Sequence, residues 1–120
     1  IKDINNWELI IESMKQVIYG KLGTARRLNH KLTYTLAGKT GTAQVFSLDP
    51  EEEYIAEDIE EKLRDHALFT GFAPIEDPQV AIAVIIENAG SGSSTAAPLA
   101  RALLDVYFSK NPIKENSSSD

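Results

Sequence analysis

The sequence predicts an α+β fold in which an antiparallel sheet is flanked by helices. Apolar residues recur at helical spacing near both ends of the chain, and the runs between them have the composition of strands. A length of 120 residues, of which 42% are hydrophobic, allows one core and is too short for two. We therefore expect one layered unit.

The first predicted element is an amphipathic helix over residues 5–19. Asn5 and Glu8 have the spacing of a capping box at its start, and Gly20 is a typical helix stop. A helical face of this composition usually belongs to the core and not to a cofactor site. The side chains expected in the core are Trp7, Ile10, Ile11, Met14, Val17 and Ile18.

The second element, after a loop over residues 20–31, is a strand over residues 33–46 that contains Ala37-Gly38-Lys39-Thr40-Gly41-Thr42-Ala43-Gln44-Val45. Thr and Val suit a pleated sheet, whereas a glycine inside a strand weakens it and often marks close approach of a ligand. Residues 13–48 carry six Lys or Arg and no acid, which would attract an anion. This strand is therefore interpreted as the wall of a site for a carboxylate or phosphate.

The third segment, residues 49–65, holds nine of the eighteen acidic residues. Asp49 and Pro50 are typical of a helix start, and the charge run favours a solvated insertion helix or a partly disordered loop. The ligand pattern of a calcium loop is absent. Because the chain lacks Cys, and because His30 and His66 have no partners at metal spacing, we expect no metal site and no cofactor.

The remaining elements are two strands and a helix. Residues 67–73 and 80–87 are separated by a short turn with Pro74 and Pro78, which predicts an antiparallel pair. The continuous apolar run of the second strand predicts a central strand. After a Gly and Ser loop over residues 88–94, a helix is expected to bury Leu99, Ala102, Leu103, Val106 and Tyr107, and residues 109–120 should be disordered.

A phosphate-binding P-loop is one alternative for the Gly38-Lys39-Thr40 sequence. The pattern fails upstream, because Thr33 stands where the first glycine belongs. It also fails downstream, because strand residues follow the lysine where a helix should begin. Nucleotide binding is therefore disfavoured, and no nucleic-acid partner is expected.

Lys39-Thr40-Gly41 also matches the third signature of serine acyl-transfer enzymes that handle penicillin. Here the strand context is the one required. A strand edge can hold an extended peptide by backbone pairing, and a backbone N–H beside it can stabilise an oxyanion.

The resemblance extends over residues 7–108. Matching segments are Gly23-Thr24-Ala25, residues 37–45, Asp65-His66-Ala67-Leu68-Phe69-Thr70-Gly71-Phe72-Ala73-Pro74, residues 80–89 and Ala96-Ala97-Pro98-Leu99-Ala100-Arg101. In these segments the chain resembles class B penicillin-binding proteins, and most of all the transpeptidases of cell elongation. The resemblance implies that residues 1–108 are the C-terminal portion of a transpeptidase domain of the penicillin-binding and serine β-lactamase-like fold.

The resemblance also implies roles for individual residues. Lys39 would support the hydroxyl network and attract a carboxylate. Thr40 and Thr42 would bind the carboxylate of the substrate or antibiotic, and the N–H of Thr42 would form one arm of the oxyanion hole. Gly41 would permit close approach of the ligand.

The nucleophile of this family lies in a Ser-x-x-Lys motif, and no such motif occurs in the 120 residues. Ser109-Lys110-Asn111 matches the family's Ser-x-Asn motif only by chance, because it follows the last helix. The chain alone is therefore expected to be inactive. A penicillin-recognising sensor and a serine β-lactamase remain alternatives to a D,D-transpeptidase.

The resemblance further implies the partners and the location of the parent protein. The implied ligands are the D-Ala-D-Ala stem peptide of peptidoglycan and β-lactam antibiotics. The implied protein partners are cell-elongation proteins and the remainder of the transpeptidase domain, in the same or a separate chain. The expected location is the periplasmic face of the bacterial inner membrane, with an anchoring helix that is not in this sequence.

Overall fold

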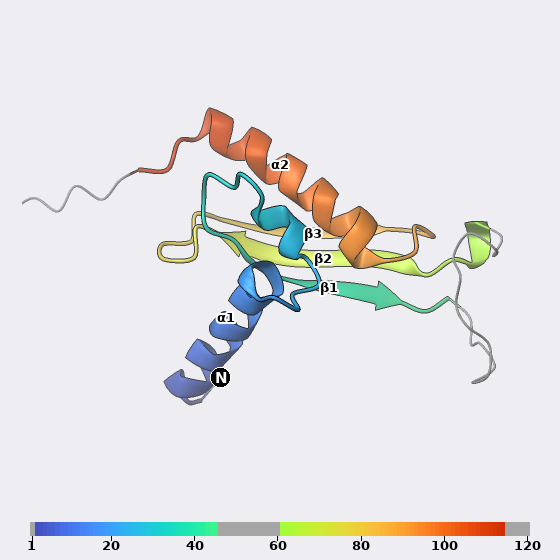
Figure 1. The fold of residues 1–120 in the computed structure, drawn as a ribbon, viewed down its shortest axis with the longest axis horizontal. Coiled ribbons are helices and arrows are strands. Elements are labelled where there is room, and N and C mark those ends of the chain that lie inside the picture. The colour runs from blue at the N-terminus through green and yellow to red at the C-terminus, as the bar shows by residue number, and fades with distance from the viewer. Residues whose placement is uncertain (1, 46–60, 115–120) are drawn as a thin grey trace, which may run out of the picture.

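The computed structural model describes residues 2–45 and 61–114 and has the predicted α+β architecture (Figure 1). The sheet carries α2 and the helical turns of residues 26–29 and 92–96 over one face, while the C-terminal end of α1 meets the sheet and the rest of this helix projects away from it. In chain order the elements are α1 (Ile4–Tyr19), η1 (Arg26–Asn29), β1 (Ala37–Ala43), η3 (Glu61–Leu63), β2 (His66–Ala73), β3 (Val80–Ile86), η4 (Gly92–Ala96) and α2 (Ala97–Lys110).

The three strands are antiparallel and lie in the order β1-β2-β3. The prediction that residues 80–87 form a central strand is therefore wrong for the described residues, because β2 is the strand with a neighbour on each side. The apolar run of β3 covers both faces of the strand, but α2 covers only one of them. Val84 is 9% exposed, whereas its neighbour Ile85 is 67% exposed.

Helix α1 begins one residue earlier than the sequence predicted. Its cap is Asp3, whose carboxylate accepts a hydrogen bond from the N–H of Asn5 at 2.9 Å, so the capping box on Asn5 is wrong. The stop at Gly20 is confirmed.

The predicted core face of α1 is only partly buried. Ile18 is fully buried, but Trp7 is 51% and Ile10 45% exposed. Because α1 touches the sheet only through its C-terminal part, its first turns have no described neighbour (Figure 1).

The first strand is shorter than the predicted span of residues 33–46. Regular pairing begins at Ala37 and ends at Ala43, opposite Phe72 and His66. The predicted loop before it contains the turn η1, whose Leu28 is buried. The helix start expected at Asp49 lies outside the described residues.

Helix α2 buries the face opposite to the predicted one. Its buried residues are Ala97, Ala100, Leu104 and Phe108. Of the larger side chains chosen from the sequence, Tyr107 is partly buried against the core, whereas Leu99, Leu103 and Val106 are exposed, with Leu103 at 50% and Val106 at 54%. The small alanines let the helix backbone lie close to the sheet, and this close approach, more than side-chain size, decides which face is inside.

The C-terminal boundary also differs from the prediction. Helix α2 continues through Lys110, so Ser109 and Lys110 belong to the helix and not to a disordered tail. Residues 111–114 have no regular structure, and residues 115–120 lie outside the described part.

Adjacent leucines of α2 provide a matched test of the buried face. In the 120-residue chain, Leu104→Ala should lower the free energy of unfolding by about 2–5 kcal/mol, because it leaves a cavity at a side chain that is 1% exposed. Leu103→Ala removes the same atoms from an exposed position and should cost less than about 1 kcal/mol. Urea unfolding followed by circular dichroism measures both, and equal losses would contradict the assignment of the two faces.

Candidate functional site

The candidate site lies on β1, which pairs with β2 along one edge only. Within the described residues its other edge carries no strand, so its backbone can pair with an extended ligand. The strand becomes more exposed along its length, from two buried residues at its start to exposed Thr42 and Ala43 at its end. Lys39 is exposed, while Thr40 and Gly41 are partly buried.

The lysine and the threonines point to different faces of the sheet. Thr40 lies opposite Phe69 and Thr42 opposite Ala67, which places both threonines on the face that β2 buries. Lys39 lies opposite Thr70 on the other face, yet its Nζ donates a hydrogen bond to the carbonyl oxygen of Thr40 at 2.7 Å. Its ammonium group is therefore held along the strand.

The hydroxyl of Thr40 has a partner from outside the strand. The Oγ1 atoms of Thr40 and Thr24 are 2.8 Å apart and share a hydrogen bond. Thr24 lies on the loop between α1 and η1. The structure thus brings together the Lys-Thr-Gly strand and the Gly23-Thr24-Ala25 segment.

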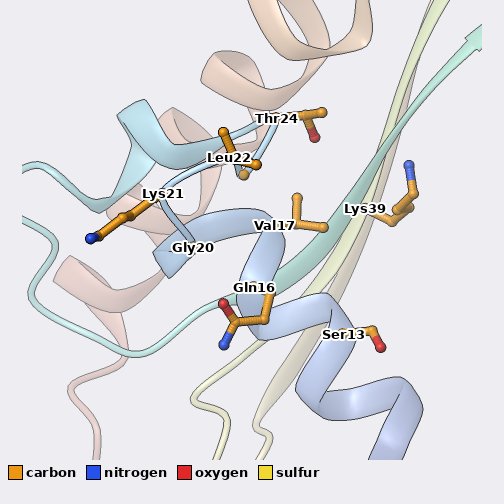
Figure 2. Close-up of a pocket in the computed structure, with 9 residues that line it drawn as sticks. Ser13, Gln16, Val17, Gly20, Lys21, Leu22, Thr24 and Lys39 are labelled. Carbon is orange, nitrogen blue, oxygen red and sulfur yellow. The ribbon is translucent and has the colours of Figure 1, made fainter.

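An open pocket of about 520 Å³ lies between α1, this loop and β1 (Figure 2). Two of its polar side chains are engaged elsewhere, since Ser13 donates to the carbonyl of Leu9 and Gln16 donates to Glu12. Its charged side chains are Lys21 and Lys39, so an anion suits it. The complete lining is Ser13, Gln16, Val17, Gly20, Lys21, Leu22, Gly23, Thr24 and Lys39.

The two glycines of β1, Gly38 and Gly41, have different structural surroundings. A Cβ on Gly38 would collide with the ring of Phe69 and the carbonyl of Thr70, so core packing explains this glycine without a ligand. A Cβ on Gly41 would meet only the Leu68 side chain, at 3.3 Å. Of the two glycines, Gly41 is therefore the one that contacts with the protein backbone do not require.

The first residue of η4, Gly92, packs directly against the backbone of β1 at Gly41. Gly92 is buried there, and a Cβ on it would collide with the carbonyl oxygens of Gly41 and Leu68. No other residue type fits without displacing β1 or β2. The position of the Lys-Thr-Gly strand therefore depends on this glycine.

The segment that precedes β1 is held in place by hydrogen bonds of Thr35. Its hydroxyl donates to the Glu76 carboxylate at 2.6 Å and accepts from the N–H of Ile75 at 2.7 Å. The hydrogen bond from Thr35 is the main reason that the pKa of Glu76 lies below its ordinary value.

The far end of β1 is fixed in a similar way. The N–H of Val45 donates to the buried carboxylate of Asp65 at 3.3 Å, and Nδ1 of His66 accepts from the N–H of Asn88 at 2.9 Å. His66 thus has a structural partner. His30 is exposed.

The described serine hydroxyls are engaged in local structure. Ser13, Ser94 and Ser109 donate to backbone carbonyls, and Ser91 shares a hydrogen bond with Ser93. Within residues 2–45 and 61–114 no group of three metal-ligating side chains is arranged to hold an ion.

Two residues of the site were not identified from the sequence as functional, namely Thr24 and Gly92. Thr24 occurs in a segment that carried the family resemblance, but no pattern in the sequence links it to Thr40. Gly92 occurs in a Gly and Ser loop, where a glycine needs no special explanation.

The comparisons with known proteins agree with this geometry. Residues 3–105 match the family described as the penicillin binding protein transpeptidase domain. Since the match covers most of the chain, the chain belongs to the penicillin-binding protein transpeptidase family.

Within the family, the chain is similar to the peptidoglycan D,D-transpeptidase MrdA. It is 45% identical to MrdA of Haemophilus influenzae over 104 residues and 46% identical to that of Escherichia coli K12 over 99 residues. These matches cover 87% and 82% of this chain, and in each case the chain spans 16% of the relative's length.

Solved structures of penicillin-binding protein 2 have the same fold. The protein from Pseudomonas aeruginosa, solved in complex with WCK 5153, is 37% identical with a TM-score of 0.74, and the match covers 99% of this chain and 23% of that one. The complex of penicillin-binding protein 2 and MreC from Helicobacter pylori gives 32% identity and a TM-score of 0.68, covering 86% and 17%. The predicted resemblance to class B penicillin-binding proteins is confirmed, and the similar structures are those of penicillin-binding protein 2.

None of the described helices has the length and apolar composition needed to cross a membrane.

Substitution of Thr35 tests how the start of β1 is held. Thr35→Val removes the hydroxyl that stabilises the ionised Glu76, so the pKa of Glu76 should rise toward its ordinary value of 4.5. Because folding lowers this pKa, the contribution of Glu76 to stability is present above pH 4.5 and is lost as the pH falls through the folded value. Carboxyl NMR titration measures the shift. Thr33→Val is the control, and an unchanged Glu76 pKa in Thr35→Val would contradict the assigned hydrogen bond.

Proposed function

We propose that this chain is part of a serine D,D-transpeptidase that cross-links peptidoglycan stem peptides and is acylated by β-lactams. The observation that carries the proposal is the open edge of β1, the strand that bears Lys39, Thr40 and Thr42. Lys39 borders a pocket whose charged side chains are all cationic. Family membership and the similarity to peptidoglycan D,D-transpeptidases support it.

The reaction would proceed in two acyl transfers. A serine hydroxyl attacks the carbonyl between the two D-alanines, its proton passes to the leaving amine, and the terminal D-alanine departs. An amine of a neighbouring strand then attacks the acyl-enzyme, which releases the serine and forms the cross-link. A β-lactam would stop the cycle at the acyl-enzyme stage.

This chain would supply binding and polarisation. The hydroxyls of Thr40 and Thr42 and the charge of Lys39 would hold the terminal carboxylate of the stem peptide. The N–H of Thr42 would donate to the developing oxyanion, and loss of such a donor costs about 3 kcal/mol in comparable acyl transfers. The bare backbone at Gly41 would let the extended peptide lie against the strand.

The nucleophile would come from the remainder of the transpeptidase domain. Exposed apolar surfaces support an additional packing partner, because soluble proteins rarely leave large apolar patches uncovered. In α1 these are Ile4, Trp7, Leu9 and Ile10, in β3 Ile85, and in α2 Leu99, Leu103 and Val106. We propose that residues 1–108 belong to this domain and pack against its other part.

By similarity to penicillin-binding protein 2, which in Helicobacter pylori was solved as a complex with MreC, the full-length protein is proposed to act with cell-elongation proteins. Its proposed location is the periplasmic face of the inner membrane.

The proposal is tested with the full-length protein and a fluorescent penicillin. The full-length protein should form a covalent adduct, and the 120-residue chain should form none. Lys39→Ala should lower the second-order rate constant of acylation by about 10- to 100-fold, the worth of a hydrogen bond to a charged group.

Lys110→Ala, at the end of α2, serves as a control and should leave the rate unchanged. An adduct that survives removal of the Ser-x-x-Lys serine would contradict the proposal. Rapid hydrolysis of the acyl-enzyme would instead assign the protein to the β-lactamases.

A further inference from the structure

We infer that Thr24 is a positioning residue of the carboxylate site, acting through the hydroxyl of Thr40. This inference rests on the proposed function. The 2.8 Å contact between the two Oγ1 atoms joins a loop residue to the Lys-Thr-Gly strand, and Thr24 borders the same pocket as Lys39 (Figure 2).

The arrangement of protons gives the pair its role. Each hydroxyl has one proton to donate and two lone pairs to accept with. When the Thr24 hydroxyl donates to Thr40, the proton of Thr40 stays free for an incoming acceptor; in the opposite arrangement, the proton of Thr24 stays free. In both arrangements one hydroxyl proton lies between the two oxygens and the other is free to donate to a ligand. The pair therefore suits a group that only accepts hydrogen bonds, such as a carboxylate.

The loop holds Thr24 in place before any ligand arrives. The N–H of Ala25 donates to the carbonyl of Val17 at 3.1 Å, and the N–H of Gly23 donates to the carbonyl of Gly20 at 2.9 Å. Ala25 is 2% exposed, so the residue after Thr24 is anchored in the core. Thr24 is therefore attached to the C-terminal end of α1 and not to a freely moving loop.

The fixed partner reduces the freedom of the Thr40 hydroxyl. Without it, the O–H bond of Thr40 could turn away from the ligand, and each binding event would have to restrict that rotation. The positive charge nearby comes from Lys39, whose ammonium is fastened to the Thr40 carbonyl at 2.7 Å. Thr24 thus orients the neutral donor of the residue to whose carbonyl the charged donor is bound. Its effect should be confined to ligands that carry the carboxylate.

The test uses the full-length protein with benzylpenicillin and its methyl ester, and each variant is compared with the unsubstituted protein on the same ligand. Thr24→Val should lower the acylation rate constant for benzylpenicillin by about three- to tenfold, the range of one ordinary hydrogen bond. It should leave the rate constant for the ester unchanged. Thr24→Ser keeps the hydroxyl and should restore the rate with benzylpenicillin, while Thr33→Val controls for loss of an exposed threonine hydroxyl.

A double-mutant cycle with Thr40→Val tests the route of action. In the Thr40→Val background, Thr24→Val should cause no further loss. Independent, additive losses would overturn the inference, as would equal losses with penicillin and ester, which indicate a structural role only. An adduct that forms at an unchanged rate in Thr24→Val overturns the role of Thr24 alone. Failure of the unsubstituted protein to form any adduct overturns the proposed function itself.

Discussion

The structure depends on one close contact, in which Gly92 lies directly against the backbone of β1 and β2. There is no room for a side chain between the start of η4 and the carbonyls of Gly41 and Leu68. Because α2 follows η4 without a break, this contact also sets where α2 begins on the sheet. Ala96, Ala97 and Ala100 are all fully buried and continue the same close approach. The strand that carries the site and the helix that covers the sheet are therefore positioned by the same constraint.

A second set of polar contacts joins the chain before β1 to α2. Arg101 forms an ion pair with Asp105 at 2.9 Å and donates to the carbonyls of Leu28, His30 and Lys31. The hydroxyl of Tyr34 donates to Asp105 at 2.7 Å, and burial, followed by this hydrogen bond, raises the pKa of Tyr34.

These contacts satisfy polar groups beneath α2 that would otherwise be costly to bury. Together with the bonds of Thr35 and Asp65 at the two ends of the strand, they fix β1 before a ligand binds. The oxyanion hole proposed for this strand would need such preorganisation, because its donors must not move as charge develops.

The sequence predicted which elements exist better than it predicted which faces they bury. Periodicity and turn residues identified both helices and the three strands, because these signals are local. The buried face of α2 was predicted wrongly, since Leu99, Leu103 and Val106 form the more apolar stripe. The structure instead buries alanines, and this choice depends on how closely two distant segments can approach. The prediction that β3 is a central strand was wrong for a related reason, since an apolar strand can have a face that the described residues do not cover.

The distinction between local signals and contacts of distant segments also explains which residues of the candidate site could be predicted. Lys39 to Thr42 are adjacent in sequence, so their residue types and strand context identified them together. Thr24 and Gly92 act through contacts with residues far along the chain, and such contacts leave no spacing pattern to find. The residues of the candidate site are therefore local in sequence, whereas the residues that support them are not.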